Sequence, residues 1–375
     1  MSKIILIGDI HLGLGYPNRY DEFLKTHKEY FSEFLIPKLK EIVNPGDIIV
    51  QLGDLFDNRS VIPIDLINYT QQIIYEISSI APLHILIGNH DLWTRSHSDV
   101  NSVSVVKYIN NVHIYEKPTK IEFNGVNILM MPYFEKKGDQ IKVIQENRDC
   151  HYLFCHSDLN GAKMHLTSVG HRTQNKIEID DFSCFRKVYS GHYHIVQEEK
   201  NFTFVGNIFQ MDRNDINDRK GIWSLDVEND SIEFIENTIS PVFRKIYIKE
   251  EKDIDRLEDL SKSKDYKDLI ISNSLLMGSR KNRRKLENIL MNNKFSSIEY
   301  LDDIEKENKD EVSTEDVSLI EEKMLSNISI KLDYEEFIKT YIENIEYSSE
   351  ETKDKILKVY DKIMKIYKDE YKLKG

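Results

Sequence analysis

Five short polar motifs, each placed directly after an apolar run, constrain this sequence most strongly. They are GDIH (8–11), GDLFD (53–57), GNHD (88–91), CHSD (155–158) and GHYH (191–194). Short apolar runs bounded by turn signals are typical of strands buried on both faces of a sheet. Loops at the carboxyl ends of such strands are where α/β folds place their sites. The sequence therefore predicts an α/β fold in which these motifs converge.

The remaining pattern supports this fold class. Apolar runs predict strands at 3–8, 47–54, 121–131, 202–206, 221–227 and 231–236, and a strand followed by a loop at 83–91, 151–158 and 187–194. Helical spacing of apolar residues predicts helices at 21–43, with Pro37 kinking or splitting the first, and at 63–79, with Pro63 near its start. Strands and helices that alternate in this way indicate an α/β protein with a mixed sheet or sandwich.

The composition and the hydrophobic pattern of the sequence change near residue 240. Pro241 marks a boundary, and FRKIYIKE (243–250) predicts a strand that opens a smaller domain. An acidic stretch at 299–322 predicts a solvated linker, and the amphipathic pattern at 332–372 predicts a helical hairpin. The expected domains are 1–240, 241–300, 301–331 and 332–375.

Composition limits the class of protein. The 375 residues carry a net charge of −13, which is not typical of a protein that coats DNA alone, although acidic metal sites remain compatible with a nuclease. No run of 18 apolar residues is present, and the N-terminal segment reads as a strand and not a signal peptide. Three cysteines without CxxC spacing favour a reducing compartment. We expect a cytoplasmic protein with no membrane contact.

The five motifs together carry a set of metal-ligand side chains. The candidates are Asp9, His11, Asp54, Asn89, His90, His156, His192 and His194. This set is too large for one ion and suits two ions that share a carboxylate. The two ions would lie about 3.5–4 Å apart, and a hydroxide between them would be made more acidic. Carboxylates and imidazoles without thiolates favour Mn²⁺, Fe²⁺ or Zn²⁺ over an all-oxygen Mg²⁺ or Ca²⁺ site. A lone GNH is more often a turn and a lone HxH more often structural, so the prediction depends on all five motifs.

The ordered set D-x-H, G-D-x-x-D, G-N-H-D, H and G-H-x-H resembles the calcineurin-like metallophosphoesterase superfamily over about residues 3–235. Within it, GDIHLG, GDLFD and GNHD resemble the SbcD-type DNA repair nucleases. DLNG (158–161) and DRKGIWSLD (218–226), with the acidic linker and hairpin, are most similar to small subunits of tailed-phage recombination endonucleases. The resemblance implies a four-layer sandwich of two mixed sheets flanked by helices, a small α+β capping domain and a C-terminal helical hairpin.

The resemblance also implies a role for each motif residue. The first ion would be held by Asp9, His11, Asp54 and His194. The second would be held by Asp54, Asn89, His156 and His192, with Asp54 bridging. His90 would not bind metal but would protonate the leaving oxygen or stabilise its charge. Asp57 would orient and charge His90, although some related nucleases carry a His there, and a turn residue or N-cap is the alternative.

The activity implied by the resemblance is cleavage of DNA. The expected enzyme is a Mn²⁺-dependent exonuclease on duplex ends and an endonuclease on single strands, with Mg²⁺ or Fe²⁺ as alternative ions. Its implied partners are DNA, an SbcC-type coiled-coil ATPase and a second copy of the chain in a homodimer. From the residues alone, only a phosphoesterase is indicated, in which two metals stabilise charge and His90 acts as the acid.

Two further surfaces are candidates for binding. An apolar stripe on the expected hairpin would dock the ATPase by helix-in-groove recognition, or alternatively would pack on its own chain. Its residues are Phe337, Tyr341, Ile345, Ile356, Val359, Tyr360, Ile363 and Tyr367. A basic cluster would contact phosphate within the capping domain, or alternatively is a solvated helix face. It consists of Arg280, Lys281, Arg283, Arg284 and Lys285, with Arg19 and Arg95 as weaker candidates near the motifs.

The sequence leaves three rival functions open. A protein Ser/Thr phosphatase of the superfamily would typically carry Arg-Gly after the second motif and Glu after GNH, where this chain has Asn58-Arg59 and Asp91. A nucleotide or general phosphodiesterase would explain the motifs but not the terminal hairpin. A non-catalytic scaffold would typically have lost ligands, and here every ligand position is filled.

Overall fold

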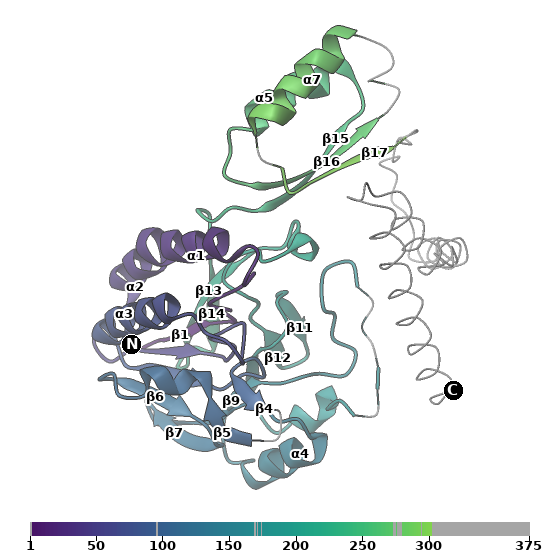
Figure 1. Ribbon diagram of the computed structural model, residues 1–375. Helices are drawn as coiled ribbons and strands as arrows, with labels where there is room; N and C mark the ends of the chain where they lie inside the picture. Colours follow the sequence, from purple (N-terminus) through teal and green to yellow (C-terminus); the bar gives the residue numbers. More distant parts are fainter. Residues whose placement is uncertain are drawn as a thin grey trace, which may run out of the picture. The chain divides into compact units, whose positions relative to one another are not determined.

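The computed structural model describes residues 2–94, 97–168, 170, 172–173, 175–272, 275, 280–293 and 295–301. These residues fall within one unit, residues 1–304 (Figure 1). The acidic linker expected at 301–331, apart from Leu301, and the docking hairpin expected at 332–375 lie outside the described residues, as does Arg95. Among the described helices, none has the length and apolar character needed to cross a membrane.

The first of two large sheets contains the N-terminal strand. Its order is β14 (Ser231–Glu236), β13 (Gly221–Asp226), β1 (Ile4–Ile7), β2 (Ile48–Gln51), β3 (Leu83–Leu86) and β6 (Val112–Tyr115). β1, β2, β3 and β6 are parallel, and β13 and β14 are antiparallel to their neighbours. The carboxyl ends of β1, β2 and β3, where three motifs begin, therefore lie at one edge of the sheet.

The second large sheet is also mixed. Its order is β11 (Gln197–Glu199), β12 (Phe202–Phe204), β10 (Lys187–Gly191), β9 (Tyr152–His156), β8 (Val126–Met131) and β7 (Thr119–Phe123). β8, β9, β10 and β12 are parallel, while β7 and β11 form antiparallel edges. β9 and β10 bring the last two motifs to the same edge.

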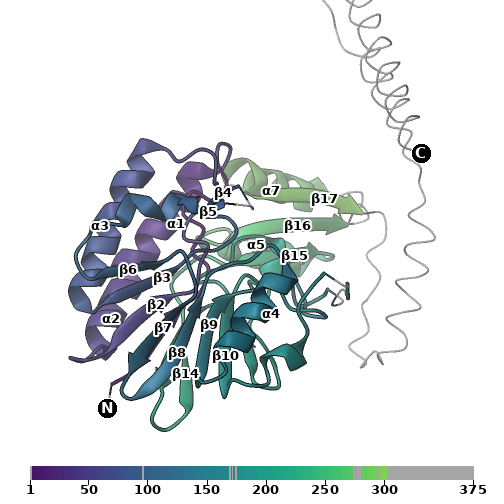
Figure 2. The same cartoon turned by 90° about the horizontal axis from the view of Figure 1, so that it is seen from below.

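Alternating side chains assemble these sheets into four layers. In β1, Ile4 and Leu6 pack between the two sheets, while Ile5 and Ile7 pack toward the helices. Helices α1 (Tyr20–Glu29), α2 (Ile36–Ile42) and α3 (Ile64–Ile80) cover the outer face of the first sheet, and α4 (Lys137–Glu146) covers that of the second (Figure 2). The predicted four-layer α/β fold is confirmed.

The helix expected at 21–43 is interrupted just before its proline. Between α1 and α2 the chain forms a π-helix, η1 (Tyr30–Leu35). Pro37 lies in the first turn of α2, where a missing N–H does no harm, but its ring crowds the carbonyl four residues earlier. The wider π turn before Pro37 accommodates that conflict.

Short elements complete the sandwich. A hairpin of β4 (Leu92–Thr94) and β5 (His97–Asn101) follows the third motif. The 3₁₀ turns are η2 (Ser102–Val106), η3 (Ile179–Phe182) and η4 (Arg213–Asp215). The β4–β5 hairpin continues directly from the loop that carries His90, so it is held next to the converging motifs.

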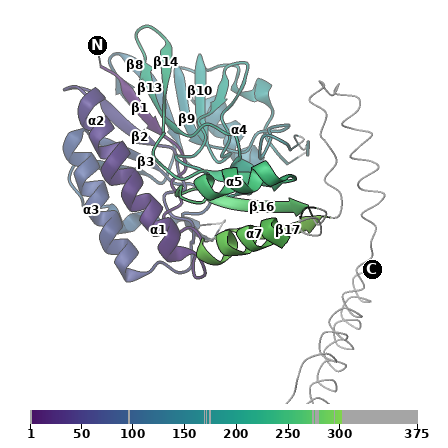
Figure 3. The ribbon, with the colours of Figure 1, turned by 90° about the horizontal axis from the view of Figure 1, so that it is seen from above.

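Residues 243–301 form a smaller α/β module with its own core. The chain runs β15 (Phe243–Ile248), α5 (Glu251–Leu260), β16 (Tyr266–Ser272), α7 (Arg280–Asn292) and β17 (Ser297–Leu301). The three strands are parallel, and both helices cover one face of the sheet (Figure 3). Leu257, Leu269 and Leu286 are among its buried residues. The expected α+β domain is therefore a β-α-β-α-β unit.

Candidate metal centre

The loops that follow β1 and β2 are tied together by their backbones. The N–H of Ile10 donates to the carbonyl of Asp54 (3.1 Å), that of Leu12 to Leu55 (2.8 Å), and that of Asp57 to Leu12 (3.0 Å). These bonds extend the parallel pairing of the two strands beyond the sheet. The side chains of the first two motifs are consequently held in a defined register.

Several candidate ligands have strained backbones. His11, Asp54 and His192 have φ values of 50°, 53° and 90°, in a region that side-chain-bearing residues seldom adopt. Strain of this kind persists where the surroundings over-determine it, and it gathers at functional sites. Gly191 is required for a different reason: a Cβ there would lie 2.5 Å from Asp9 Oδ1. The backbone is thus shaped to bring these groups close together.

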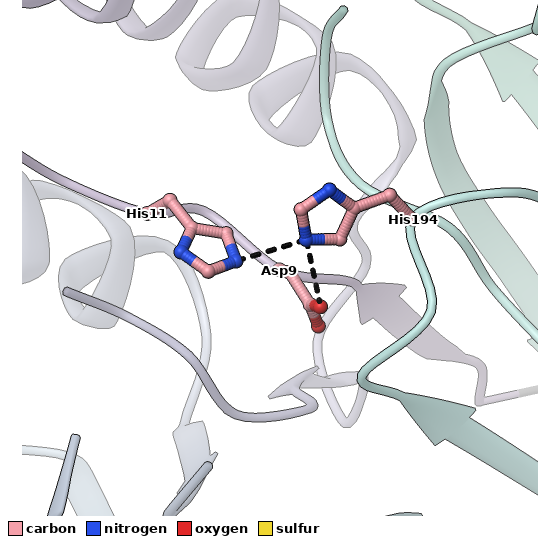
Figure 4. A group of neighbouring side chains, drawn as sticks. All are labelled: Asp9, His11 and His194. Atoms are coloured by element: carbon pink, nitrogen blue, oxygen red, sulfur yellow. Dashed lines mark hydrogen bonds and ion pairs between the residues drawn. The ribbon is translucent and has the colours of Figure 1, made fainter. Parts of the chain in front are cut away.

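A first ligand set consists of Asp9, His11 and His194, whose candidate ligand atoms lie within 4.8 Å of one another (Figure 4). The Nε2 atoms of the two histidines are 3.0 Å apart, and His194 Nε2 is 3.7 Å from Asp9 Oδ2. Asp9 and His11 come from the loop after β1, and His194 from the loop after β10. Segments more than 180 residues apart therefore meet at one point.

A second ligand set consists of Asp54, Asn89, His156 and His192. The Oδ1 of Asn89 lies 3.0 Å from His156 Nε2 and 2.8 Å from His192 Nδ1. Asp54 Oδ2 lies 3.3 Å from His156 Nε2. The candidate ligand atoms of Asp54, His156 and His192 also lie within 4.8 Å of one another. The second set gathers two carboxyl or amide oxygens and two imidazole nitrogens.

Asp54 lies between the two sets. Its Oδ2 is 3.3 Å from His156 Nε2 and 3.8 Å from His11 Nε2, while its Oδ1 accepts a hydrogen bond from the backbone N–H of His90 (2.8 Å). Burial disfavours the charged form of Asp54, but the facing imidazole of His156 outweighs it and holds the pKa of Asp54 well below its usual range. Asp54, whose Oδ2 faces ligand nitrogens of both sets, therefore favours the ionised form.

The donor set fits divalent cations. Burial alone would lower the pKa of His11, but the hydrogen bond to Asp57 and the charges of Asp54 and Asp9 raise it to about 9. Burial also opposes charge on His156, and Asp54 raises its pKa to about 9. The nearby carboxylates thus favour positive charge on His11 and His156, and divalent cations bound by the same groups would supply that charge instead. Mixed oxygen and nitrogen donors suit Mn²⁺, Fe²⁺ or Zn²⁺.

His90 is half-buried at the rim of the first set. Its ring meets that of His11 edge-on, with centroids 4.8 Å apart. Its Nδ1 lies 2.7 Å from the backbone carbonyl of Asp57. The carboxylate of Asp57 instead faces His11, with Oδ1 3.1 Å from His11 Nδ1. Asp57 therefore contacts His90 through its main-chain carbonyl and His11 through its carboxylate, and candidate ligand atoms of all three residues lie within 4.8 Å of one another. The expectation that Asp57 orients His90 stays a prediction.

Asp91, the last residue of GNHD, was given no role from the sequence. It is fully buried, and its carboxylate accepts backbone N–H groups of Gly88 (2.9 Å), Phe56 (3.0 Å) and Leu55 (3.3 Å). Burial, and then the charge of Asp54, raise its pKa to about 7. Asp91 ties the loop that carries Asn89 and His90 to the loop that carries Asp54. The position of Asp91 within the GNHD motif is the sequence feature that could have indicated this role.

Lys220 was also missed as a residue of the site. Its side chain is 3% exposed, and its Nζ donates to the carbonyl of His194 (2.9 Å), to Asp215 Oδ1 (2.8 Å) and to Asp218 Oδ2 (2.6 Å). The three protons of the ammonium group are matched by three acceptors. Lys220 thereby anchors the backbone of His194 from outside the five motifs, in the segment DRKG.

The basic cluster lies on the amphipathic helix α7. Arg283 pairs with Glu287 on the same helix (3.0 Å), and Lys285 pairs with Asp255 and Glu258 of α5. Lys281 and Arg284 are exposed, and among the described residues no carboxylate pairs with them. The Arg280 side chain lies outside the described part. Of the four cations whose side chains the structure describes, Lys281 and Arg284 are therefore the better candidates for phosphate contact.

Comparisons with known proteins agree with this geometry. The profile of a family described as calcineurin-like phosphoesterase matches residues 2–196, which contain all five motifs. Exonuclease subunit 1 of Enterobacteria phage T4 is 28% identical over 247 residues, covering 63% of this chain and 68% of that protein. One subunit of nuclease SbcCD from Staphylococcus epidermidis is 26% identical over 266 residues, covering 61% and 67%. Putative phosphoesterase 244L of Invertebrate iridescent virus 6 is 25% identical over 215 residues, covering 56% and 70%.

Proposed function

This chain belongs to the calcineurin-like phosphoesterase family, and from that premise we propose that it is a DNA nuclease subunit that uses two divalent metal ions. The observation that carries the proposal is the convergence of two ligand sets on the shared carboxylate of Asp54. Two bound ions would activate water as a nucleophile and offset the charge that develops on the phosphoryl group. The proposed ions are Mn²⁺, with Mg²⁺ or Fe²⁺ as alternatives.

Each ligand has a proposed place in this scheme. One ion is held by Asp9, His11, Asp54 and His194. The other is held by Asp54, Asn89, His156 and His192. Asn89 serves as a neutral ligand because its Oδ1 faces both histidines of its set. This division uses the groups Asp9–His11–His194 and Asp54–His156–His192. A third group, His11–Asp57–His90, shares His11 with the first, and we assign its His90 to proton transfer instead of metal binding.

His90 is the proposed general acid. The carbonyl of Asp57 can only accept a hydrogen bond, so His90 Nδ1 carries a proton toward it. This contact fixes the ring and leaves Nε2 as the nitrogen that holds and releases the transferred proton. General acids of this kind typically contribute 10²–10⁴-fold to a rate. Asp57 supports both the acid, through its carbonyl, and the ligand His11, through its carboxylate.

DNA is proposed as the substrate because two of the relatives are named as nuclease or exonuclease subunits. On this basis we propose exonuclease action on duplex ends and endonuclease action on single strands. The word subunit in both names supports a partner, which we propose to be a coiled-coil ATPase of the SbcC type, with two copies of this chain in the assembly. A general or nucleotide phosphodiesterase is the second candidate, favoured by the viral relative named as a phosphoesterase.

The parts beyond residue 240 have proposed roles in holding the substrate and the partner. The α/β module would act as a capping domain that positions DNA over the metal centre, with Lys281 and Arg284, two exposed cations of α7, as proposed phosphate contacts. Residues 301–331 would link it to a hairpin at 332–375 that docks the ATPase. These assignments extend the nuclease proposal and are tested separately from it.

The test is a nuclease assay with Mn²⁺ on linear duplex and single-stranded circular DNA, with bis(p-nitrophenyl) phosphate as a small diester. Wild type, His90→Ala and His151→Ala are compared with and without the ATPase partner. His151 is an exposed histidine that precedes β9, whose opposite end carries His156, so it is the matched control. We expect His90→Ala to reduce DNA cleavage about 10²–10⁴-fold and His151→Ala to retain it.

Three other outcomes would redirect the proposal. Turnover of the small diester with DNA left intact, even with the ATPase present, would leave a general phosphodiesterase. Absence of turnover on every substrate, in a chain that binds metal, would favour a scaffold. Equal loss in His90→Ala and His151→Ala would remove His90 from the chemistry.

A further inference from the structure

Each ligand histidine has a second ring nitrogen that points away from its ligand set. The Nδ1 of His156 lies 2.8 Å from the carbonyl of Leu52, and the Nδ1 of His11 lies 3.1 Å from Asp57 Oδ1. Such outer contacts decide which nitrogen carries the proton and which presents a lone pair. The same question applies to His192, for which neither the motifs nor the proposed function names an outer partner.

His192 faces the second ligand set through Nδ1. This atom is 2.8 Å from Asn89 Oδ1 and 3.3 Å from His156 Nε2. The opposite nitrogen, Nε2, is 3.5 Å from Oδ1 of Asp158. Asp158 ends the CHSD motif, whose histidine belongs to the same ligand set. The carboxylate therefore lies behind the His192 ring and not among the ligand atoms.

Asp158 is itself held in place by two donors. Its Oδ1 accepts a hydrogen bond from the Tyr193 hydroxyl (2.5 Å) and pairs with Lys176 Nζ (3.0 Å). Lys176 Nζ also donates to the Tyr193 hydroxyl (2.6 Å), which closes a three-membered network. Tyr193 is 5% exposed, and its ring packs against Phe204 with centroids 4.9 Å apart. The carboxylate is thus fixed by a buried phenol and an ammonium group.

We propose that Asp158, clamped by Tyr193 and Lys176, is a positioning residue that keeps the proton of His192 on Nε2 and presents Nδ1 to the second metal ion. The inference rests on the proposed two-metal function. It gives the two ligand sets equivalent supports, because the Asp57 carboxylate backs His11 in the first set as Asp158 backs His192 in the second. Carboxylates in this position raise the basicity of the ligand, and their loss typically weakens metal binding 10–100-fold.

A purely structural role for Asp158 makes a different prediction. If Asp158 only ties the loop after β9 to Tyr193, then its removal would lower thermal stability and leave the affinity for metal unchanged. The discriminating measurement is therefore metal affinity in the full chain, recorded alongside the melting temperature of the metal-free protein.

The experiment is a Mn²⁺ titration of the full chain in which free Mn²⁺ is followed by electron paramagnetic resonance. The variants are Asp158→Ala, Asp158→Asn and, as a matched control, Asp180→Ala, an exposed carboxylate paired with Lys200. Wild type is expected to bind two ions. Asp158→Ala should weaken one of them 10–100-fold and leave the other unchanged. Asp158→Asn should recover part of the loss, because its amide oxygen still accepts from Nε2–H, and Asp180→Ala should match wild type.

The outcomes separate this inference from the proposed function. Two ions bound by Asp158→Ala with wild-type affinity would overturn the positioning role and leave the two-metal proposal intact. Fewer than two ions bound by wild type would overturn both. If Asp158→Ala fails to fold, then Tyr193→Phe, which removes one bond to the carboxylate and keeps the ring, replaces it. A weaker single ion in that variant supports the role, and two unchanged ions contradict it.

Discussion

The two ligand sets differ most clearly in one histidine each, His156 in the second set and His194 in the first. In the second set, the His156 side chain is fully buried and that of His192 is 19% exposed. In the first set, the side chain of His194 is 32% exposed. His156 is the last residue of β9, whereas His194 lies beyond the end of β10 and is anchored by Lys220. One histidine of the second set is thus part of a strand, whereas the most exposed histidine of the first set lies in a loop.

This difference indicates distinct behaviour for the two ions of the proposed centre. Ligands on regular elements hold their geometry more closely than ligands on loops. Electrostatic attraction is also stronger where water is excluded. We therefore expect the second set to bind its ion more tightly and the first set to exchange its ion more readily. Four predictions test this comparison.

The largest effect is expected for Asp54→Asn, which removes the charge shared by both sets. Because Asp54 faces His11 and His156, affinity for both ions should fall by more than the 10–100-fold typical of outer partners, and turnover of bis(p-nitrophenyl) phosphate should fall to background. Metal content after gel filtration measures the first quantity. Retention of one tightly bound ion would show that Asp54 serves a single set.

Lys220→Met tests whether Lys220 anchors His194 in the first ligand set. Its removal leaves Asp215 and Asp218 buried without their cation, which typically costs about 3–5 kcal/mol of unfolding free energy. Affinity for the ion of the first set should also fall, because His194 loses the donor to its carbonyl. Denaturant unfolding and Mn²⁺ titration measure these effects.

The matched control for that variant is Lys200→Met. Lys200 pairs with Asp180 at the surface, where both side chains are more than half exposed, so the change should stay within about 1 kcal/mol. If Lys220→Met matched this control in stability and in Mn²⁺ affinity, then Lys220 would not anchor the site.

A direct comparison of His156→Ala with His194→Ala tests whether burial of a ligand histidine goes with tighter metal binding. Each variant should lose one ion, and His156→Ala should lose the tighter one. His156→Ala should also lower the unfolding free energy by about 1–3 kcal/mol, because the buried carbonyl of Leu52 loses its partner, while His194→Ala should change it less. Loss of the more tightly bound ion in His194→Ala would contradict the expectation that the second set binds its ion more tightly than the first.

The smallest effect is expected for the double variant Lys281→Gln/Arg284→Gln, which leaves both ligand sets unchanged. If these cations contact phosphate, then the slope of log affinity for DNA against log salt should fall by about 1 for each of them. Turnover of the small diester should match wild type. Arg283→Gln is the control, because Arg283 already pairs with Glu287. An unchanged salt slope in the double variant would mark α7 as a solvated face.

Much of the fold could be predicted because the pattern is local. Apolar runs such as 3–8 and 47–54 predict strands β1 and β2, and the break near Pro37 is present as a π-helix. The short strands β4 and β11 were not predicted, since three residues carry too little periodicity. The parallel form of the α/β module was also missed, because its last strand begins at Ser297 without a strong apolar run.

For the candidate site, the sequence predicted the motif residues that converge but not all of the contacts between them. The side chains named from the motifs do converge, because each follows a strand whose end faces the same edge. The contact of Asp57 with His90 was expected and is made by its main-chain carbonyl, whereas the contact of its carboxylate with His11 and the contacts of Asp91, Asp158 and Lys220 were not anticipated. These residues act on groups that are distant in sequence, and no spacing rule reports such contacts.

The sequence by itself determined which side chains can bind metal and that they follow strands, because residue type and strand periodicity are local properties. Only the tertiary structure decided which atoms face one another. The positions of Asp57 behind His11, Asp158 behind His192 and Lys220 behind His194 depend on loops packed across two sheets. The chemistry of an imidazole depends on the partner of its second nitrogen, and that partner is chosen by packing over long sequence distances.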